Sequence, residues 1–176
     1  MAKSLEDFVT TIPDFPQPGV MFRDITTIIQ SPEGFKMAVD MLVDKLKDVD
    51  FDYVVGSESR GFVFGTPVAY AMGKGFVMAR KKGKLPRECI SESYDLEYGQ
   101  ATLEMHKDSF PAGSKVVIID DLIATGGTTK AIVKMVEKLG GKVVKIGFVL
   151  ELEGFKAREK MLKGYDVYSL LAYPGI

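Results

Sequence analysis

The sequence has few of the residues that form covalent cross-links or metal sites. It contains one cysteine, one histidine and no tryptophan among 176 residues. A single cysteine, Cys89, cannot form an internal disulfide, so nothing implies an oxidising compartment. No histidine, cysteine and aspartate residues cluster at metal-ligand spacing. We therefore expect any metal ion to arrive with a substrate.

An excess of one charge and a long apolar run are also lacking. Lys and Arg number 23 and Asp and Glu number 24, and this balance argues against a nucleic-acid partner. No apolar run approaches the ~18 residues of a membrane span. Residues 1–15 carry acids and a proline where a secretory signal has its apolar core. We therefore expect a cytoplasmic protein with no membrane partner.

The sequence does contain a repeated alternation of apolar runs and amphipathic stretches. Its length and its 46% of hydrophobic residues fit one domain over 1–176. Apolar runs predict strands at 51–56, 75–80, 114–120, 142–150 and 166–171, and helical spacing predicts helices at 31–49, 128–139 and near 154–163. This order indicates an α/β fold in which helices flank a twisted parallel sheet. Such sheets bind ligands outside the carboxyl ends of their strands.

Two segments depart from that alternation. After a possible short helix at 4–11, the stretch "PDFPQPGVMFRD" has three prolines and cannot be a helix. The segment 81–110 begins with charged residues that show no helical or strand periodicity, and its later part, "QATLEMHK", alternates like a strand. Because an insertion of this length in a compact domain is usually functional, we expect a flexible flap at 81–110.

A short turn between the strand at 114–120 and its helix has the composition of a phosphate site. Glycines at 126 and 127 allow the backbone to expose its N–H groups, and Thr125 and Thr128 add hydroxyl donors. The helix N-terminus adds a partial positive charge that favours a monophosphate. The spacing matches neither the P-loop nor the dinucleotide-binding motif. An ordinary turn with a threonine cap is the alternative.

Two acids, Asp120 and Asp121, stand directly before that turn. A carboxylate only accepts hydrogen bonds, so a pair of carboxylates suits the vicinal hydroxyls of a sugar. A ribose 5-phosphate would place its hydroxyls on the acids and its phosphate on the turn. The alternative is a solvated strand end.

The segment "VVIIDDLIATGGTT" closely resembles the phosphoribosyl-diphosphate binding motif of the type I phosphoribosyltransferases. The resemblance implies that Asp120 and Asp121 hold the ribose hydroxyls and that the 5-phosphate is bound by Ala124, Thr125, Gly126, Gly127 and Thr128. It extends over essentially the whole chain, through "PDFPQPGVMFRDIT", "SESRGFVFG", "RKKGKLP", "SYDLEYG" and "YSLLAYPG".

The likeness is to the members of this family that act on adenine. It implies transfer of the 5-phosphoribosyl group from phosphoribosyl diphosphate to adenine, forming AMP and diphosphate. It also implies a homodimer, a small hood at about 1–30, and Mg²⁺ bound with phosphoribosyl diphosphate. Two alternatives remain: a sister enzyme for a 6-oxopurine or orotate, and a regulator that senses phosphoribosyl diphosphate and binds nucleic acid.

The diphosphate that leaves in such a reaction is an anion, so its binding residues are expected to be basic. Arg60 has a planar fork suited to it, and the resemblance gives Ser59 the same role. In the basic run "RKKGK", the resemblance suggests that Lys84 contacts diphosphate and that Arg80 reaches across a dimer interface. An exposed arginine in a capping turn, and a solvated charge run, are the alternatives.

The flap carries the candidate acid/base. By resemblance Glu97 handles the proton of the purine, with Tyr98 as a lid that excludes water. Glu104 is the rival carboxylate on the alternating strand. His106, on the same strand face as Glu104, could reach the diphosphate, although a lone histidine is more often structural.

The base pocket is expected in the N-terminal segment. Phe22 offers an aromatic face for a purine, and an extended backbone at Met21 and Arg23 could give one carbonyl and one N–H to the adenine edge. Leu122 is a plausible opposite wall. The choice of adenine depends mainly on the resemblance.

Overall fold

The computed structural model describes residues 3–96 and 99–175. Short N-terminal elements are followed by alternating strands and helices. In chain order, with η for a 3-10 helix, these are η1 (Leu5–Phe8), β1 (Thr10–Pro13), β2 (Met21–Asp24), α1 (Thr26–Gln30), α2 (Pro32–Asp44), β3 (Tyr53–Ser57), α3 (Arg60–Ala71), β4 (Gly75–Lys81), β5 (Cys89–Asp95), β6 (Gln100–His106), β7 (Lys115–Ile123), α4 (Gly127–Lys138), β8 (Lys142–Leu152), η2 (Glu153–Phe155), α5 (Ala157–Lys160) and β9 (Val167–Tyr173).

The main sheet has seven strands in the order β5-β6-β4-β3-β7-β8-β9. The five strands from β4 to β9 pair in parallel, which confirms the predicted α/β sheet. The predicted flap forms an antiparallel hairpin, β5–β6, and β6 joins β4 antiparallel at Arg80 and Lys81. The sheet is therefore mixed, with a parallel centre and an antiparallel flap.

Strand β7 is covered on both faces, as its lack of alternation predicts. Val116 and Ile118 pack into the core on one face, and Val117 and Ile119 pack into the core on the other. The strand runs on to Ile123, further than predicted. Asp120 and Asp121 are therefore residues of the strand itself.

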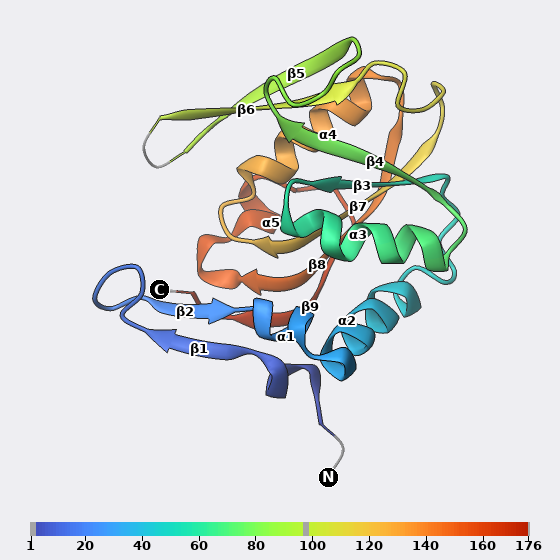
Figure 1. Cartoon of the computed structure of the whole chain (residues 1–176). Coiled ribbons are helices and arrows are strands. Elements are labelled where there is room, and N and C mark those ends of the chain that lie inside the picture. The colour runs from blue at the N-terminus through green and yellow to red at the C-terminus, as the bar shows by residue number, and fades with distance from the viewer. Residues whose placement is uncertain (1–2, 97–98, 176) are drawn as a thin grey trace.

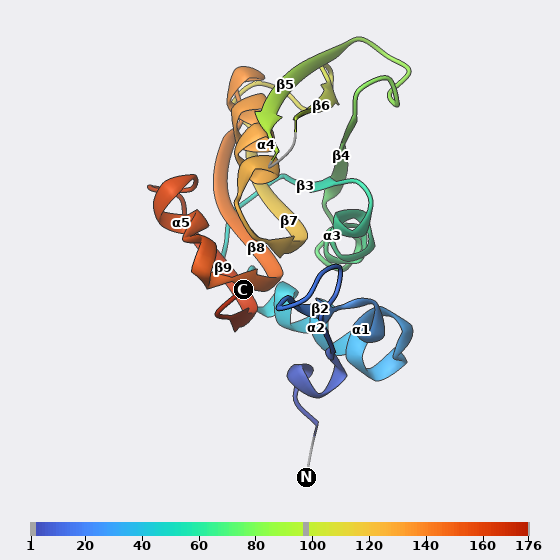
Figure 2. The same ribbon diagram turned by 90° about the vertical axis from the view of Figure 1, so that its left-hand side faces the viewer.

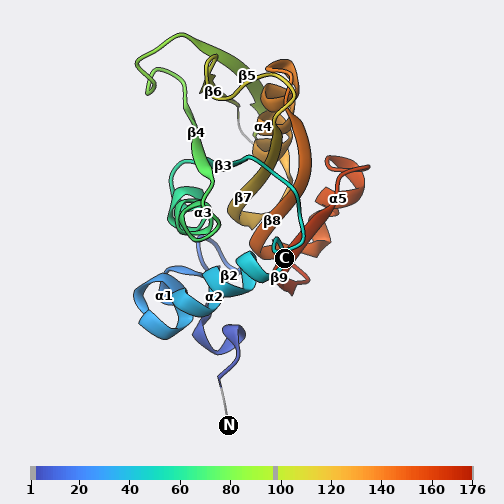
Figure 3. The same cartoon turned by 90° about the vertical axis from the view of Figure 1, so that its right-hand side faces the viewer.

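Helices cover both faces of the parallel sheet (Figure 2 and Figure 3). Helices α2 and α3 pack on one face, where Leu42, Phe64 and Val68 are buried. Helix α4 and the short α5 pack on the other face, with Ile132 and Ala157 buried.

Several helical regions differ from the prediction: α1 was not predicted, and α2 ends at Asp44, short of the predicted end at 49. Helix α3 was not predicted, because Pro67 lies inside it and proline disfavours a helix interior. The helix predicted near 154–163 was wrong in extent, since only Ala157–Lys160 forms α5. The chain turns before it, where Gly154 N–H donates to Pro174 at 2.7 Å and Lys156 takes a left-handed φ of 55°.

The N-terminal segment forms the antiparallel pair β1–β2, with Ile12 opposite Phe22. The predicted short helix is a 3-10 turn, Leu5–Phe8, and the Thr27 hydroxyl ties it down by donating to the Phe8 carbonyl at 2.6 Å. In Figure 1 this hood and the flap hairpin both extend toward the side of the sheet where β7 and β8 end.

The helices within the described residues include none that is both long enough and apolar enough to cross a membrane.

A contact between strands β8 and β9 provides a test of the fold. Gly147 of β8 lies opposite Tyr168 of β9, and a β-carbon on Gly147 would meet the ring of Tyr168, whose hydroxyl donates to the Leu42 carbonyl. We predict that Gly147→Ala lowers the free energy of unfolding by about 1–3 kcal/mol, because the ring must move. Urea denaturation measures the change.

The control removes the obstructing ring. In a Tyr168→Ala background the same Gly147→Ala change should cost much less, because nothing then occupies the space. Equal costs in the two backgrounds would contradict the predicted contact.

Candidate active site

Asp120 is a buried carboxylate that the protein holds with two hydrogen bonds. Its side chain accepts a bond from the Ser57 hydroxyl at 2.5 Å and another from the Asp121 backbone N–H at 2.8 Å. Burial raises the pKa of Asp120 well above its usual value, and the negative charge of Asp121 adds to the effect. The interpretation of these acids as a solvated strand end is wrong, since Asp120 is 5% exposed and Asp121 7%.

Asp121 forms an ion pair with Arg60, whose Nε lies 2.5 Å from the carboxylate. Arg60 begins α3, directly after strand β3, so two neighbouring parallel strands bring the pair together. Gly61 follows Arg60 and allows a close approach, since a β-carbon there would lie 2.5 Å from an Asp120 oxygen. The glycine therefore lets α3 begin directly against the buried acid.

The turn between β7 and α4 encloses a cavity of about 150 Å³. Its lining includes the predicted phosphate loop, Ala124 to Thr128, together with Leu122, which was predicted to line the base pocket. Gly126 has a φ of 85°, a conformation that favours glycine, and α4 begins after it. Exposed N–H groups at this N-terminus suit an anion.

A second cavity, of about 250 Å³, lies beside the acids. Its lining residues are Glu58, Ser59, Arg60, Lys81 and Asp121. Ser59 and Arg60 are thus placed together, as the diphosphate hypothesis requires. Lys81 was missed, because its place beside Arg60 depends on the pairing of β4 with β3.

The other cations of the basic run, Arg80, Lys82 and Lys84, are not among the residues that line this cavity. Arg80 pairs with Glu58 of the same chain, with Nε 3.2 Å from the carboxylate, and Glu58 also accepts the Lys81 backbone N–H at 2.8 Å. Lys84 is exposed and is not among the residues that line this cavity. Its predicted contact with diphosphate remains a prediction.

The flap reaches the phosphate loop through a residue that was not singled out from the sequence. The Thr128 hydroxyl donates to the Tyr94 hydroxyl at 3.1 Å, and the Tyr94 ring lies close to Gly127. Glu92 of the same strand bonds Lys134 and Lys138 of α4 at 2.9 and 2.6 Å. Strand β5 is therefore docked on α4 beside the loop.

The predicted acid/base Glu97 and the predicted lid Tyr98 lie outside the described residues. The rival Glu104 accepts the Gly83 backbone N–H at 2.8 Å, so this carboxylate is bonded to the turn that follows β4. His106 is buried against Arg87, whose backbone N–H lies 3.3 Å from Nε2. The structure does not place His106 among the residues that line the cavity beside the acids.

The hood residues form their own cluster. Phe22 meets the Phe15 ring edge-on at 5.1 Å, and the Arg23 guanidinium lies 4.3 Å from the centre of the Tyr173 ring. Met21 is half exposed. The predicted extended backbone of Met21 to Arg23 is confirmed as strand β2, whereas its contact with a base remains a prediction.

Within the described part of the chain, no three His, Cys, Asp or Glu side chains could together hold a metal ion. The carboxylates at the site are those of Asp120 and Asp121, with Glu58 in the lining of the cavity beside them. Mg²⁺ commonly binds through one or two carboxylates plus substrate phosphates and keeps several waters. The site therefore fits Mg²⁺ that is carried mainly by a phosphorylated ligand.

Taken together, these side chains can hold a dianionic group at one end, hydroxyls in the middle and a second anion at the other end. The phosphate loop, the acids and the Arg60 cavity follow one another along the ends of β7 and β3. The arrangement suits a sugar with phosphates at both ends.

Comparison with known proteins agrees with this geometry. A family model described as "Phosphoribosyl transferase domain" matches residues 26–172, most of the chain after the hood. The chain is 57% identical over 173 residues to the adenine phosphoribosyltransferase of Lachnoclostridium phytofermentans, covering 98% of this chain and 99% of the relative.

Solved structures are also similar. Adenine phosphoribosyltransferase from Thermoanaerobacter pseudethanolicus has a TM-score of 0.91 and 47% identity, over 97% of this chain and 100% of that chain. The Saccharomyces cerevisiae enzyme, solved with an imino-altritol bisphosphate and adenine, has a TM-score of 0.88 and 42% identity, over 95% and 96% of the two chains. The chain therefore belongs to the phosphoribosyltransferase family and, within it, to the adenine phosphoribosyltransferases.

Proposed function

We propose that this protein transfers the 5-phosphoribosyl group from phosphoribosyl diphosphate to N9 of adenine, forming AMP and diphosphate. The observation that carries the proposal is the position of two buried acids between an anion-sized turn and an arginine-lined cavity. A ribose that carries a phosphate at one end and a diphosphate at the other matches that order.

Each end of the substrate has its own residues. The backbone N–H groups and hydroxyls of Thr125 to Thr128 bind the 5-phosphate, aided by the N-terminus of α4. Asp120 and Asp121 accept hydrogen bonds from the ribose hydroxyls. Ser59, Arg60 and Lys81 line the cavity for the diphosphate, and we expect Lys84 of the same basic run to contact the bound diphosphate.

Charge stabilisation supports the reaction. As the glycosidic bond breaks, negative charge develops on the diphosphate, where the cations Arg60, Lys81 and Lys84 neutralise it. Mg²⁺ bound with the substrate beside Asp120 and Asp121 would supply further positive charge to the diphosphate. Glu97 handles the proton of the purine, and the flap excludes water from the ribosyl centre.

The hood supplies the base pocket in this proposal. Phe22 provides the aromatic face, and the backbone of Met21 and Arg23 binds the polar edge of adenine. A 6-oxopurine presents the opposite donor pattern there and would leave buried groups unpaired.

Three finer points belong to the proposal as well. The protein works in the cytoplasm, as its composition suggests, and as a homodimer, as the sequence resemblance implies. In the dimer Arg80 reaches the partner's site, which requires it to leave Glu58 of its own chain.

A substrate panel tests the activity. With phosphoribosyl diphosphate and Mg²⁺, adenine should be converted to AMP, while hypoxanthine, guanine, xanthine and orotate should give a kcat/KM lower by about 10⁴-fold or more, because the mispaired edge leaves buried polar groups without partners. Conversion of another base at the rate of adenine would contradict the choice of adenine.

Removal of the two acids tests the role of the ribose hydroxyls. The double variant Asp120→Asn with Asp121→Asn should lose on the order of 10²–10⁴-fold in kcat/KM, because each lost charged hydrogen bond is worth about 1.5–3 kcal/mol. Far-ultraviolet circular dichroism should show an intact fold. Wild-type kinetics in this variant would refute the role.

The single variant Asp120→Asn should stabilise the free protein at neutral pH. Because the folded pKa of Asp120 is raised, its contribution to stability is present below its unfolded pKa of 3.8 and is lost as pH rises through the folded value. The stability advantage of the variant, measured by urea denaturation, should therefore grow as pH rises above 3.8 and level off above the folded pKa of Asp120. An advantage that shrinks with pH would contradict the burial of this charge.

Metal dependence follows from the donor set. Mg²⁺ titrated calorimetrically into the protein alone should bind weakly, and binding should tighten when phosphoribosyl diphosphate is present. EDTA should abolish turnover, and added Mg²⁺ should restore it. Tight binding of Mg²⁺ to the free protein would contradict a metal carried by the substrate.

A further inference from the structure

A second buried carboxylate, Glu151, has no part in the reaction described above. It lies near the end of β8, is 5% exposed, and pairs in the sheet with Ile123, the last residue of β7. The phosphate loop begins at the next residue, Ala124. Glu151 is therefore one strand away from the point where the loop leaves the sheet.

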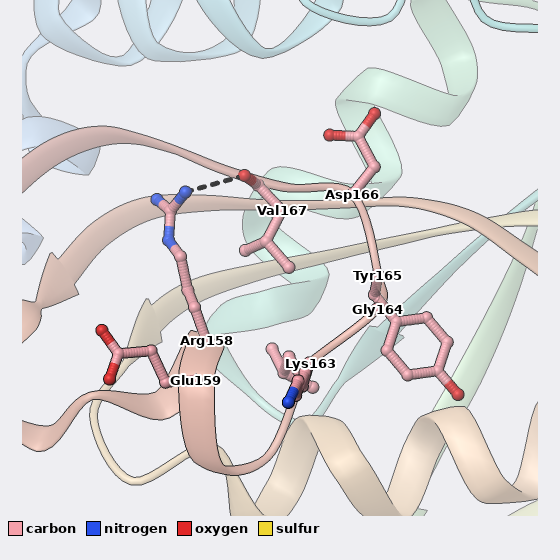
Figure 4. A pocket seen from close by; sticks show the side chains of 8 residues that line it. Arg158, Glu159, Lys163, Gly164, Tyr165, Asp166 and Val167 are labelled. Carbon is pink, nitrogen blue, oxygen red and sulfur yellow. Dashed lines mark hydrogen bonds between the residues drawn. The ribbon is translucent and has the colours of Figure 1, made fainter.

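The partner of Glu151 is Arg158 of helix α5. Arg158 Nε lies 2.9 Å from both carboxylate oxygens, and its Nη2 also donates to the carboxylate. The remaining donors bond the Val167 carbonyl at 2.8 Å, drawn in Figure 4, and the Ser169 hydroxyl at 2.5 Å. One guanidinium thus joins α5 to both β8 and β9.

These bonds outweigh the cost of burial. Burial alone would raise the pKa of Glu151, but the hydrogen bonds from Arg158 and Ser169 hold this pKa below its usual value. The carboxylate is therefore charged at neutral pH and depends on Arg158 for compensation.

Helix α5 forms the floor of the phosphate loop. A β-carbon on Gly126 would lie 3.1 Å from the β-carbons of both Ala157 and Met161, so the loop backbone rests on this helix. The helix spans only Ala157–Lys160 and begins after a left-handed residue, Lys156. A helix this short has little stability of its own and needs tertiary contacts.

We infer that Arg158, through its ion pair with Glu151, is a positioning residue that sets the place of the 5-phosphate loop. The inference rests on the proposed phosphate role of that loop. Arg158 lies beside the open hollow of about 550 Å³ in Figure 4 and lines neither the cavity of the phosphate loop nor the cavity beside the acids. It acts by holding α5 against the strand position next to the loop.

Loss of the pair has a specific consequence. Without Arg158, Glu151 is left as a buried charge with the Ser169 hydroxyl as its remaining side-chain partner, and such a group draws in water or moves toward solvent. Either change shifts α5 and, with it, Gly126. Because phosphate binding depends on amide positions, displaced amides form longer and poorer hydrogen bonds and bind the phosphate more weakly.

The test compares Arg158→Ala, Arg158→Lys and Glu151→Gln with a matched control, Lys145→Ala. Lys145 also lies on β8 and forms an ion pair, at 3.4 Å, with Asp166 in the segment before β9, so the control breaks a neighbouring ion pair outside α5. Steady-state kinetics give the KM for each substrate, and urea denaturation confirms that each variant is folded.

Two variants should raise the KM for phosphoribosyl diphosphate by about tenfold or more: Arg158→Ala and Glu151→Gln. The KM for adenine and kcat should stay within about threefold of wild type, because neither the base pocket nor the Arg60 cavity rests on α5. Arg158→Lys should fall between, since lysine keeps the charge but loses the paired bonds. Lys145→Ala should leave all three constants unchanged.

Amide chemical shifts distinguish a failure of the positioning role from a failure of the proposed phosphate binding. Titration of wild-type protein with ribose 5-phosphate should change the chemical shifts of the Gly126 and Gly127 amides. If these chemical shifts do not change, the phosphate role of the loop is contradicted. If wild type shows the shifts and Arg158→Ala or Glu151→Gln binds ribose 5-phosphate as tightly, the positioning role is overturned. A fall in stability with unchanged KM values also overturns it, because the pair would then serve only the fold.

Discussion

The structure depends on keeping two adjacent carboxylates buried at the end of one strand. Asp120 and Asp121 are almost inaccessible, and burial together with the negative charge of Asp121 raises the pKa of Asp120 well above its usual value. The protein offsets this with the Ser57 hydroxyl and the Arg60 guanidinium. Ser57 is the last residue of β3 and Arg60 the first of α3, so the parallel pairing of β3 with β7 brings both partners to the acids.

The surrounding fold also holds the acids and the phosphate loop in place. The core residues of β7 alternate between two apolar layers, and the helices on each face supply those layers. Gly61 lets α3 start against Asp120, while Gly126 lets the phosphate loop rest on α5. A floor held by the Glu151–Arg158 pair then fixes the far end of the site. Acids, loop and floor are thus set by three neighbouring parallel strands, β3, β7 and β8.

The strand β7, the two acids and the phosphate turn could be predicted from the sequence, because residues close together in the chain determine them. The unbroken apolar run of β7, the acids and the glycine–threonine turn stand together in one segment, and their order alone indicates a sugar phosphate. Contacts between distant segments could not be predicted in the same way. Lys81 enters the site through strand pairing, α3 forms despite Pro67, and α5 is cut short by a bond between Gly154 and Pro174.

The central claim is that a ribose phosphate lies across the end of β7, with its hydroxyls on the acids and its phosphate in the turn. A crystal structure of the protein with AMP tests it most directly. The account predicts ribose hydroxyls at about 2.5–3.0 Å from the carboxylates of Asp120 and Asp121, with the phosphate among the N–H groups of residues 125–128. A nucleotide bound elsewhere, with that turn and both acids free of it, would contradict the account.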